Sequence, residues 1–176
     1  FIFPNAPIRP VTVNNGLPMP AWYDIYSLGV RRDREDATGI LESVAVVHGL
    51  IDHERATGIS AARIVLAGFS QGGAIALQAG VRYPQPLAGI LALSTYLPLA
   101  GTLATQGTAA NRGTPILMCH GRQDSVVALE LARKSFDTLN AQGYAPRWLE
   151  YPMQHQLCPE EILAISQWLK QVLPPL

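Results

Sequence analysis

The segment LAGFSQGG, residues 66–73, joins an apolar run to an apolar helical pattern through a serine that is flanked by glycines. Gly68 lies two residues before Ser70, and Gly72 lies two residues after it. A strand that reverses sharply into a helix leaves little room for side chains beside the turn, so small residues are expected at both positions. The segment therefore predicts a strand, a tight turn with Ser70 exposed, and a helix.

The rest of the chain alternates between two kinds of apolar pattern. Short runs rich in β-branched or aromatic residues are typical of buried strands, and longer segments with a period of about 3.6 residues are typical of helices. This alternation predicts an α/β fold with a mainly parallel sheet and helices on both faces. The predicted strands are residues 1–3, 63–69, 89–93, 115–120 and 147–151, and the predicted helices cover roughly residues 33–57, 71–83, 126–142 and 159–172.

Two stretches lack such periodicity. Residues 4–20 are rich in proline, glycine and asparagine, and residues 98–114 form a second irregular stretch. Both are predicted as long loops, which in compact domains usually frame a functional site. Because no linker or internal repeat interrupts the pattern, residues 1–176 are interpreted as a single α/β domain.

The composition argues against several classes of partner. Thirteen basic residues balance thirteen acidic ones, so net charge gives no reason to expect binding to nucleic acid. No run approaches the roughly 18 apolar residues of a membrane span, and no stable membrane insertion is expected. Cys119 and Cys158 belong to no metal-binding pattern, which predicts two free thiols, no metal and a cytoplasmic protein.

Three polar residues follow predicted strands, at the edge where doubly wound sheets bind ligands. Ser70 follows the strand at residues 63–69, Asp124 follows residues 115–120, and His155 follows residues 147–151. The order Ser, Asp, His is the order found in α/β-hydrolases. We expect His155, oriented by Asp124, to take the proton of Ser70, and the backbone N–H of Gln71 to form part of an oxyanion hole.

Each of these residues has a structural alternative. Ser70 could be a small turn residue, Asp124 could cap the helix that begins near Val126, and His155 could be an ordinary loop residue. Their common position after strands favours the catalytic interpretation. His48 lies in AVVHGL, which imitates an oxyanion loop, but the helical spacing around it predicts a histidine on a helix surface.

Five motifs carry a resemblance to a known family across almost the whole chain. They are PNAPIRPVTVNNGLPMPAWYDI, GFSQGG, LSTYLP, HGRQDSVV and YPMQHQLCPEEI, in this order. In them the chain resembles the carboxylesterase and acyl-protein thioesterase branch of the α/β-hydrolase superfamily. The resemblance implies a serine carboxylesterase that uses no cofactor, with Ser70 as nucleophile, Asp124 as acid and His155 as base. An acyl-protein thioesterase or lysophospholipase with the same site is the alternative.

The resemblance also predicts what precedes Phe1. Members of this branch typically begin with two or three strands and a loop resembling HGLG, which donates the second oxyanion N–H. We therefore expect about forty further residues before Phe1 in the intact protein, with one of their strands between residues 1–3 and 63–69. A non-catalytic lipid-binding or scaffold relative is the rival interpretation.

The expected ligand is a small-molecule ester or thioester. Apolar residues near Ser70, such as Ala74, Ile75 and Leu97, suit an acyl chain of small or medium length. A homodimer stays open as an oligomeric state, and the sequence does not separate ester from thioester substrates.

Overall fold

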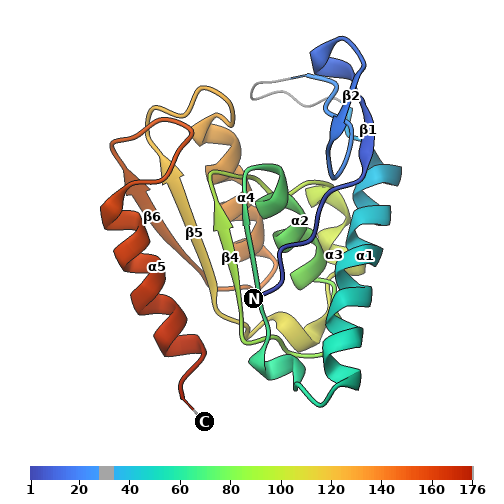
Figure 1. Ribbon diagram of the computed structural model, residues 1–176. Coiled ribbons are helices and arrows are strands. Elements are labelled where there is room, and N and C mark those ends of the chain that lie inside the picture. Colours follow the sequence, from blue (N-terminus) through green and yellow to red (C-terminus); the bar gives the residue numbers. More distant parts are fainter. Residues whose placement is uncertain (28–33, 176) are drawn as a thin grey trace.

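The computed structural model describes residues 1–27 and 34–175, and its main feature is a parallel sheet (Figure 1). The strands lie side by side in chain order, and each pairs in parallel with the next. This confirms the predicted α/β class and four of the five predicted strands. The four are β3 (Val65–Phe69), β4 (Gly89–Leu93), β5 (Ile116–Gly121) and β6 (Pro146–Tyr151).

Helices cover both faces of this sheet (Figure 1). Ile90 and Ala92 of β4 pack with residues of α2 and α4 on one face, whereas Leu91 and Leu93 pack with Trp168 of α5 on the other. The first helix packs against α2. All four predicted helices are confirmed, although the predicted start at residue 33 lies outside the described residues. They are α1 (Ala37–Ala56), α2 (Gln71–Gly80), α4 (Leu129–Ala141) and α5 (Pro159–Val172).

The predicted loop at residues 4–20 is wrong, because this stretch forms an antiparallel hairpin. Strands β1 (Ile8–Val11) and β2 (Leu17–Pro20) pair through the turn that contains the short helix η1 (Thr12–Asn14). Pro10 lies opposite Pro18, which a ribbon of two edge strands tolerates because one side of each strand makes no ladder bonds. The dipeptide Asn15-Gly16, with φ of 57° and 72°, was the turn signal in the sequence.

The second predicted loop, residues 98–114, contains short helical turns instead of irregular chain. These are η3 (Ala100–Thr102), α3 (Leu103–Gln106) and η4 (Ala109–Asn111), and a further turn, η2 (Ala61–Arg63), precedes β3. Buried Asn111 holds this region by donating to the carbonyls of Tyr83 and Gln85 and accepting from the N–H of Leu87. Such a side chain satisfies buried backbone groups that no strand pairs with.

The predicted strand at residues 1–3 is also wrong. Phe1, Ile2 and Phe3 are exposed and irregular, and the rings of Phe1 and Phe3 stack on each other with centroids 6.4 Å apart. A strand needs a neighbour for its backbone N–H and C=O groups, so a short apolar run does not make one by itself. In the sheet that residues 1–27 and 34–175 form, β3 is an edge strand, and the strand expected beside it stays a prediction.

The two cysteines carry free thiols, as predicted. Cys119 is buried in β5, and burial raises the pKa of its thiol to about 12, which keeps it protonated. Cys158 is half-buried just before α5. Among the described helices, none has the length and apolar character that a membrane crossing requires.

Glu161, in the first turn of α5, is fully buried, and neither of its carboxylate oxygens has a hydrogen-bond partner among the described residues. Burial raises the pKa of this carboxyl to about 7, although the nearby backbone N–H of Cys158 favours the charged form. Cys119 and Tyr151 lie close enough to interact with it electrostatically. Between about pH 4.5 and pH 7, the folded protein therefore keeps a proton on Glu161, whereas an unfolded chain, in which the pKa of this carboxyl is near 4.5, releases it.

This difference predicts a pH-dependent loss of stability. The contribution of protonated Glu161 is fully present below about pH 4.5 and is lost as the pH rises toward 7, because only the folded state must bury the charge. Glu161→Gln should therefore be more stable than the wild type at pH 8, by up to about 3 kcal/mol, and similar to it at pH 4.5. Urea unfolding at the two pH values measures this. The control is Glu160→Gln, which alters an exposed neighbour in the same turn and should show no such divergence.

Candidate active site

Ser70, His155 and Asp124 meet at the carboxyl edge of the sheet, each just beyond the end of a strand. Nε2 of His155 lies 2.9 Å from Oγ of Ser70, and Nδ1 lies 2.7 Å from Oδ2 of Asp124. His155 thus stands between the other two side chains, as predicted from the chain order. The arrangement allows the imidazole to accept the hydroxyl proton while the carboxylate holds the opposite N–H.

The backbone at Ser70 has the strained conformation expected of a sharp turn between strand and helix. Its φ is 52° and its ψ is −119°, a combination that a residue with a side chain rarely adopts. Several bonds hold it: the N–H of Ser70 donates to the carbonyl of Leu93 (2.8 Å), and the hydroxyl of Thr95 donates to the carbonyl of Ser70 (2.6 Å). The strain is therefore supported by the end of β4 and the loop that follows it.

The glycines around the turn do not have equal steric roles. A Cβ at Gly68 would collide with backbone atoms of Gly72 and Gly73, and one at Gly73 would lie 2.8 Å from the side chain of Thr95. A Cβ at Gly72 would meet only Nε1 of Trp22, at 4.0 Å. The expectation that both positions require a small residue is therefore correct at Gly68 and wrong at Gly72. It is the backbone of Gly72 that crowds Gly68, whereas a side chain on Gly72 would point into open space.

A pair of variants tests this account of the turn. Gly68→Ala should lower the free energy of unfolding by about 3 kcal/mol, since neither backbone can move away without breaking the turn. Gly72→Ala should leave stability unchanged or raise it by up to about 1 kcal/mol, because alanine is the better helix former and has room. Chemical denaturation of both proteins measures the difference. Equal destabilisation by the two substitutions would contradict the account.

Asp124 is held by the backbone of its own loop. Its Oδ1 accepts from the N–H groups of Val126 and Val127, each at 2.9 Å, which leaves Oδ2 for His155. This Asp124 oxygen thus caps the turn that precedes α4, so the capping role foreseen for Asp124 coexists with its contact to His155. The side chain is fully buried, which strengthens these bonds by excluding water.

Backbone hydrogen bonds join the two loops that carry Asp124 and His155. The acid loop, residues 122–128, follows β5, and the histidine loop, residues 152–158, follows β6. The N–H of Arg122 donates to the carbonyl of Tyr151, and the N–H of Gln123 donates to the carbonyl of Met153. A Cβ at Gly121 would collide with the carbonyl oxygens of Met153 and Gln154, so only glycine permits this approach. These contacts hold the two loops in place relative to each other and thereby set the distance between Asp124 and His155.

A second histidine, His120, is a neighbour of the site. It is buried, its Nε2 donates to the carbonyl of Val127 (2.9 Å), and the same nitrogen lies 3.5 Å from Oδ2 of Asp124. Burial lowers the pKa of His120, which favours the neutral ring. His120 thus contacts the acid loop at Val127 and at Asp124 and holds it from the end of β5. Its place directly before Gly121 at the end of a strand was the available sequence signal.

The remaining histidines lie in α1, as predicted for His48. The Nε2 atom of His48 lies 2.9 Å from the carbonyl of Ala79 in α2, and its ring meets the edge of Tyr83. His48 is therefore half-buried between two helices and takes no part in an oxyanion loop. His53 is exposed on the same helix.

The apolar surface beside Ser70 differs from the expected one. Ala74, Ile75 and Leu97 belong to the core, with exposed fractions of 0%, 2% and 3%, so none of them forms an exposed apolar surface beside Ser70. Exposed apolar side chains near the site include Phe69, whose ring centroid lies 4.7 Å from that of His155, and Val126. Helical spacing in the sequence does not distinguish the inner face of α2 from a face that borders a site.

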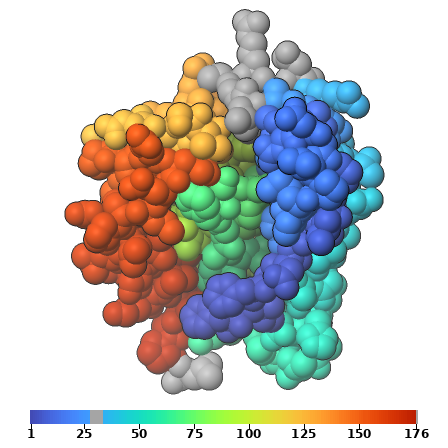
Figure 2. Space-filling view, turned by 45° about the horizontal axis from the view of Figure 1, so that its top comes forward, coloured from blue at the N-terminus to red at the C-terminus, as the bar shows by residue number. Residues whose placement is uncertain are grey.

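Figure 2 turns this end of the molecule toward the viewer and shows it hollowed. The hairpin, in blue, and the orange segments near residue 150 rise on opposite sides, with green atoms from the middle of the chain between them. The strand-end loops that carry the three side chains thus surround an open depression. Within the described residues, no three His, Cys, Asp or Glu side chains are grouped so as to hold a metal ion.

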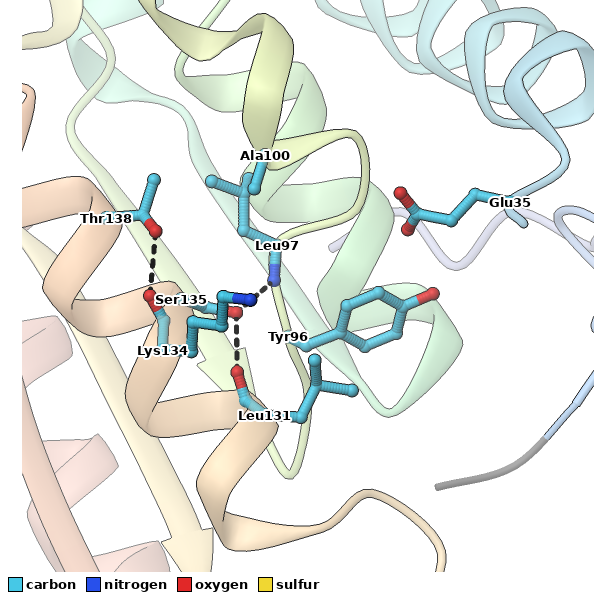
Figure 3. Close-up of a pocket in the computed structure, with 8 residues that line it drawn as sticks. All are labelled: Glu35, Tyr96, Leu97, Ala100, Leu131, Lys134, Ser135 and Thr138. Atoms are coloured by element: carbon cyan, nitrogen blue, oxygen red, sulfur yellow. Dashed lines mark hydrogen bonds between the residues drawn. The ribbon is translucent and has the colours of Figure 1, made fainter. Parts of the chain in front are cut away.

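A separate small cavity of about 150 Å³ lies between α4 and the segment after β4 (Figure 3). Ser135 closes one side of it by accepting from the N–H of Leu97 and donating to the carbonyl of Leu131. None of the three site side chains lines this cavity. Its lining residues are Glu35, Tyr96, Leu97, Ala100, Leu131, Lys134, Ser135 and Thr138.

Comparison with known proteins identifies the family of this chain. The sequence profile of the phospholipase/carboxylesterase family matches residues 1–173. The chain belongs to this family. It is 44% identical to acyl-protein thioesterase 1 of Gibberella zeae, over 99% of this chain and 77% of that protein. The corresponding protein of Neurospora crassa is also 44% identical, over 99% of this chain and 74% of the relative.

Comparison with solved structures shows that this chain has the α/β-hydrolase fold. The crystal structure of SOBER1 from Arabidopsis thaliana superposes with a TM-score of 0.93 at 33% identity, covering 98% of this chain and 83% of that one. The predicted fold and family are thereby confirmed, and the protein is a hydrolase.

Proposed function

We propose that this protein is a serine hydrolase that cleaves carboxylic esters or thioesters through an acyl-enzyme, with Ser70 as nucleophile. The observation that supports this most is the unbroken series of contacts from Asp124 through His155 to Ser70, at 2.7 and 2.9 Å. A buried carboxylate, an imidazole and a hydroxyl in this geometry activate the hydroxyl oxygen for attack on an acyl carbon.

The proposed reaction has two halves. Oγ of Ser70 attacks the carbonyl carbon while its proton passes to Nε2 of His155, and Asp124 stabilises the imidazolium through Nδ1. The tetrahedral intermediate then collapses, and the alcohol or thiol leaves with that proton. In the second half, water attacks the acyl-enzyme by the same route and releases the carboxylic acid.

The negative oxygen of the intermediate needs hydrogen-bond donors. Gln71 is the first residue of α2, where backbone N–H groups have no partner inside the helix and the helix dipole favours negative charge. Its N–H is the proposed donor from this segment. The second donor, expected from residues before Phe1, stays a prediction.

The substrate class is proposed as small to medium acyl groups. The exposed Phe69 and Val126 beside the site offer apolar contact and no charge. The relatives in Gibberella zeae and Neurospora crassa are named acyl-protein thioesterases, which favours a thioester as the second candidate. Matched octanoyl oxygen ester and thioester substrates, compared with butyryl and palmitoyl ones, decide between them. Cytoplasmic location and the absence of a cofactor stay predictions, and a homodimer stays open.

Replacing the nucleophile tests the central proposal. Ser70→Ala should reduce ester hydrolysis by at least about 10³-fold, because no other group in the site can form the acyl-enzyme. A fluorophosphonate probe should label the wild type at Ser70 only, as read by peptide mass spectrometry. A wild type that hydrolyses no ester or thioester would favour the non-catalytic relative, and an active Ser70→Ala would mean that another residue is the nucleophile.

The acid residue offers a subtler test. Asn at position 124 could still accept from the N–H groups of Val126 and Val127, but its NH₂ would face Nδ1 of His155. The imidazole would then carry its proton on Nε2 and could not accept one from Ser70. Asp124→Asn should therefore lower kcat by about 10³- to 10⁴-fold with little loss of stability. Ser125→Ala, in the same loop, is the control and should keep near wild-type kcat.

A further inference from the structure

The side chain of Gln71 makes a two-point contact with a distant part of the chain. Its Oε1 accepts from the N–H of Trp22 at 2.7 Å, and its Nε2 donates to the carbonyl of Tyr23 at 2.8 Å. The amide group thereby bonds the backbones of two consecutive residues, Trp22 and Tyr23. The contact joins the residue after the nucleophile to residues 22–24, which we call the strap.

The strap is anchored elsewhere as well. The hydroxyl of Ser43 in α1 donates to the carbonyl of Trp22, and the N–H of Asp24 donates to Oδ2 of Asp36 (2.9 Å). The hydroxyls of Tyr23 and Tyr96 lie 3.1 Å apart. These bonds attach the strap to α1 and to the loop after β4, so it offers Gln71 a fixed support.

The strap also borders the site. Nε1 of Trp22 lies 4.0 Å from the position that a Cβ on Gly72 would occupy, in the first turn of α2. Trp22 itself is half-buried. The side-chain amide of Gln71 therefore connects the turn at Ser70 to the strap beside it.

The peptide plane between Ser70 and Gln71 is the element that this contact can control. Its carbonyl end accepts from the hydroxyl of Thr95 (2.6 Å) and from the N–H of Ala74 (3.0 Å). Because a trans peptide is planar, the N–H of Gln71 points in the opposite direction from that carbonyl. Bonds at the carbonyl end alone allow the plane to rock, and a support at the Gln71 end restricts this motion.

We infer that the Gln71 side chain is a positioning residue, which fixes the direction of its own backbone N–H toward the oxyanion by bonding to the strap. The inference rests on the proposed function and adds to it a role for a side chain that does not touch the reacting atoms. Misdirecting one oxyanion donor should cost less than the roughly 10²- to 10³-fold that losing it costs. We expect about a tenfold effect.

Gln71→Met keeps the length of the side chain and removes both hydrogen bonds. It should lower kcat for an octanoyl ester about tenfold and weaken inhibition by an octyl trifluoromethyl ketone, which forms a tetrahedral adduct, by a similar factor. KM should stay within about threefold, because the oxyanion is absent from the ground-state complex. Gln171→Met, which makes the same replacement at an exposed position of α5, is the matched control and should keep kcat within about threefold.

Gln71→Glu gives a second test, in which the pH decides whether both hydrogen bonds to the strap can form. An ionised carboxylate can accept from Trp22 but repels the carbonyl of Tyr23, whereas a protonated one donates to it and restores both bonds. The kcat of Gln71→Glu relative to the wild type should therefore rise as the pH is lowered from 8 to 5. Gln71→Met should show a constant ratio over this range.

The outcomes separate the inference from the proposed function. If Ser70→Ala is inactive and Gln71→Met has the kcat of the wild type, the inference is wrong and the proposed function stands. An equal loss of kcat in Gln71→Met and Gln171→Met would also overturn it, because the loss would then not depend on the contact with the strap. Full activity in Ser70→Ala would overturn the proposed function, and the inference with it.

Discussion

The reversal of the chain at Ser70 is the constraint on which the site depends. Strand β3 runs directly into α2, and the two backbones come so close at Gly68 that no side chain fits there. Ser70 takes a φ of 52° because Leu93 and Thr95 hold its backbone in place. The hydroxyl is thereby presented at the edge of the sheet, beside the unpaired N–H groups of the following helix.

Polar contacts to the backbone, more than apolar packing, position the groups around that hydroxyl. Asp124 uses one oxygen to hold its own loop and the other to hold His155. Backbone bonds between the acid loop and the histidine loop fix their separation, with Gly121 allowing the close approach. A site built in this way is organised before substrate arrives, which is the condition for electrostatic stabilisation of a transition state.

The sheet beneath the site explains why its loops can be held so firmly. Strands β4 and β5 are buried along their whole length, and successive residues alternate between the α2 and α4 face and the α5 face. The carboxyl ends of these strands form one rigid edge, and the residues of the site follow directly from it. The same packing buries Glu161 in the first turn of α5, which makes the stability of the fold sensitive to pH.

The sequence by itself determined the α/β class, the four strands of the main sheet, the four long helices and the meeting of Ser70, Asp124 and His155. These are set by local periodicity and by the rule that parallel strands end at one edge, both of which can be read along the chain. Only the tertiary structure decided the hairpin at residues 8–20, the open space at Gly72, the burial of Ala74 and the contact of Gln71 with the strap. Each of these features depends on which distant segment of the chain packs against or bonds to the residue. A local pattern of residue types does not contain this information, because the hydrogen bonds and packing contacts are made by groups far apart in the sequence.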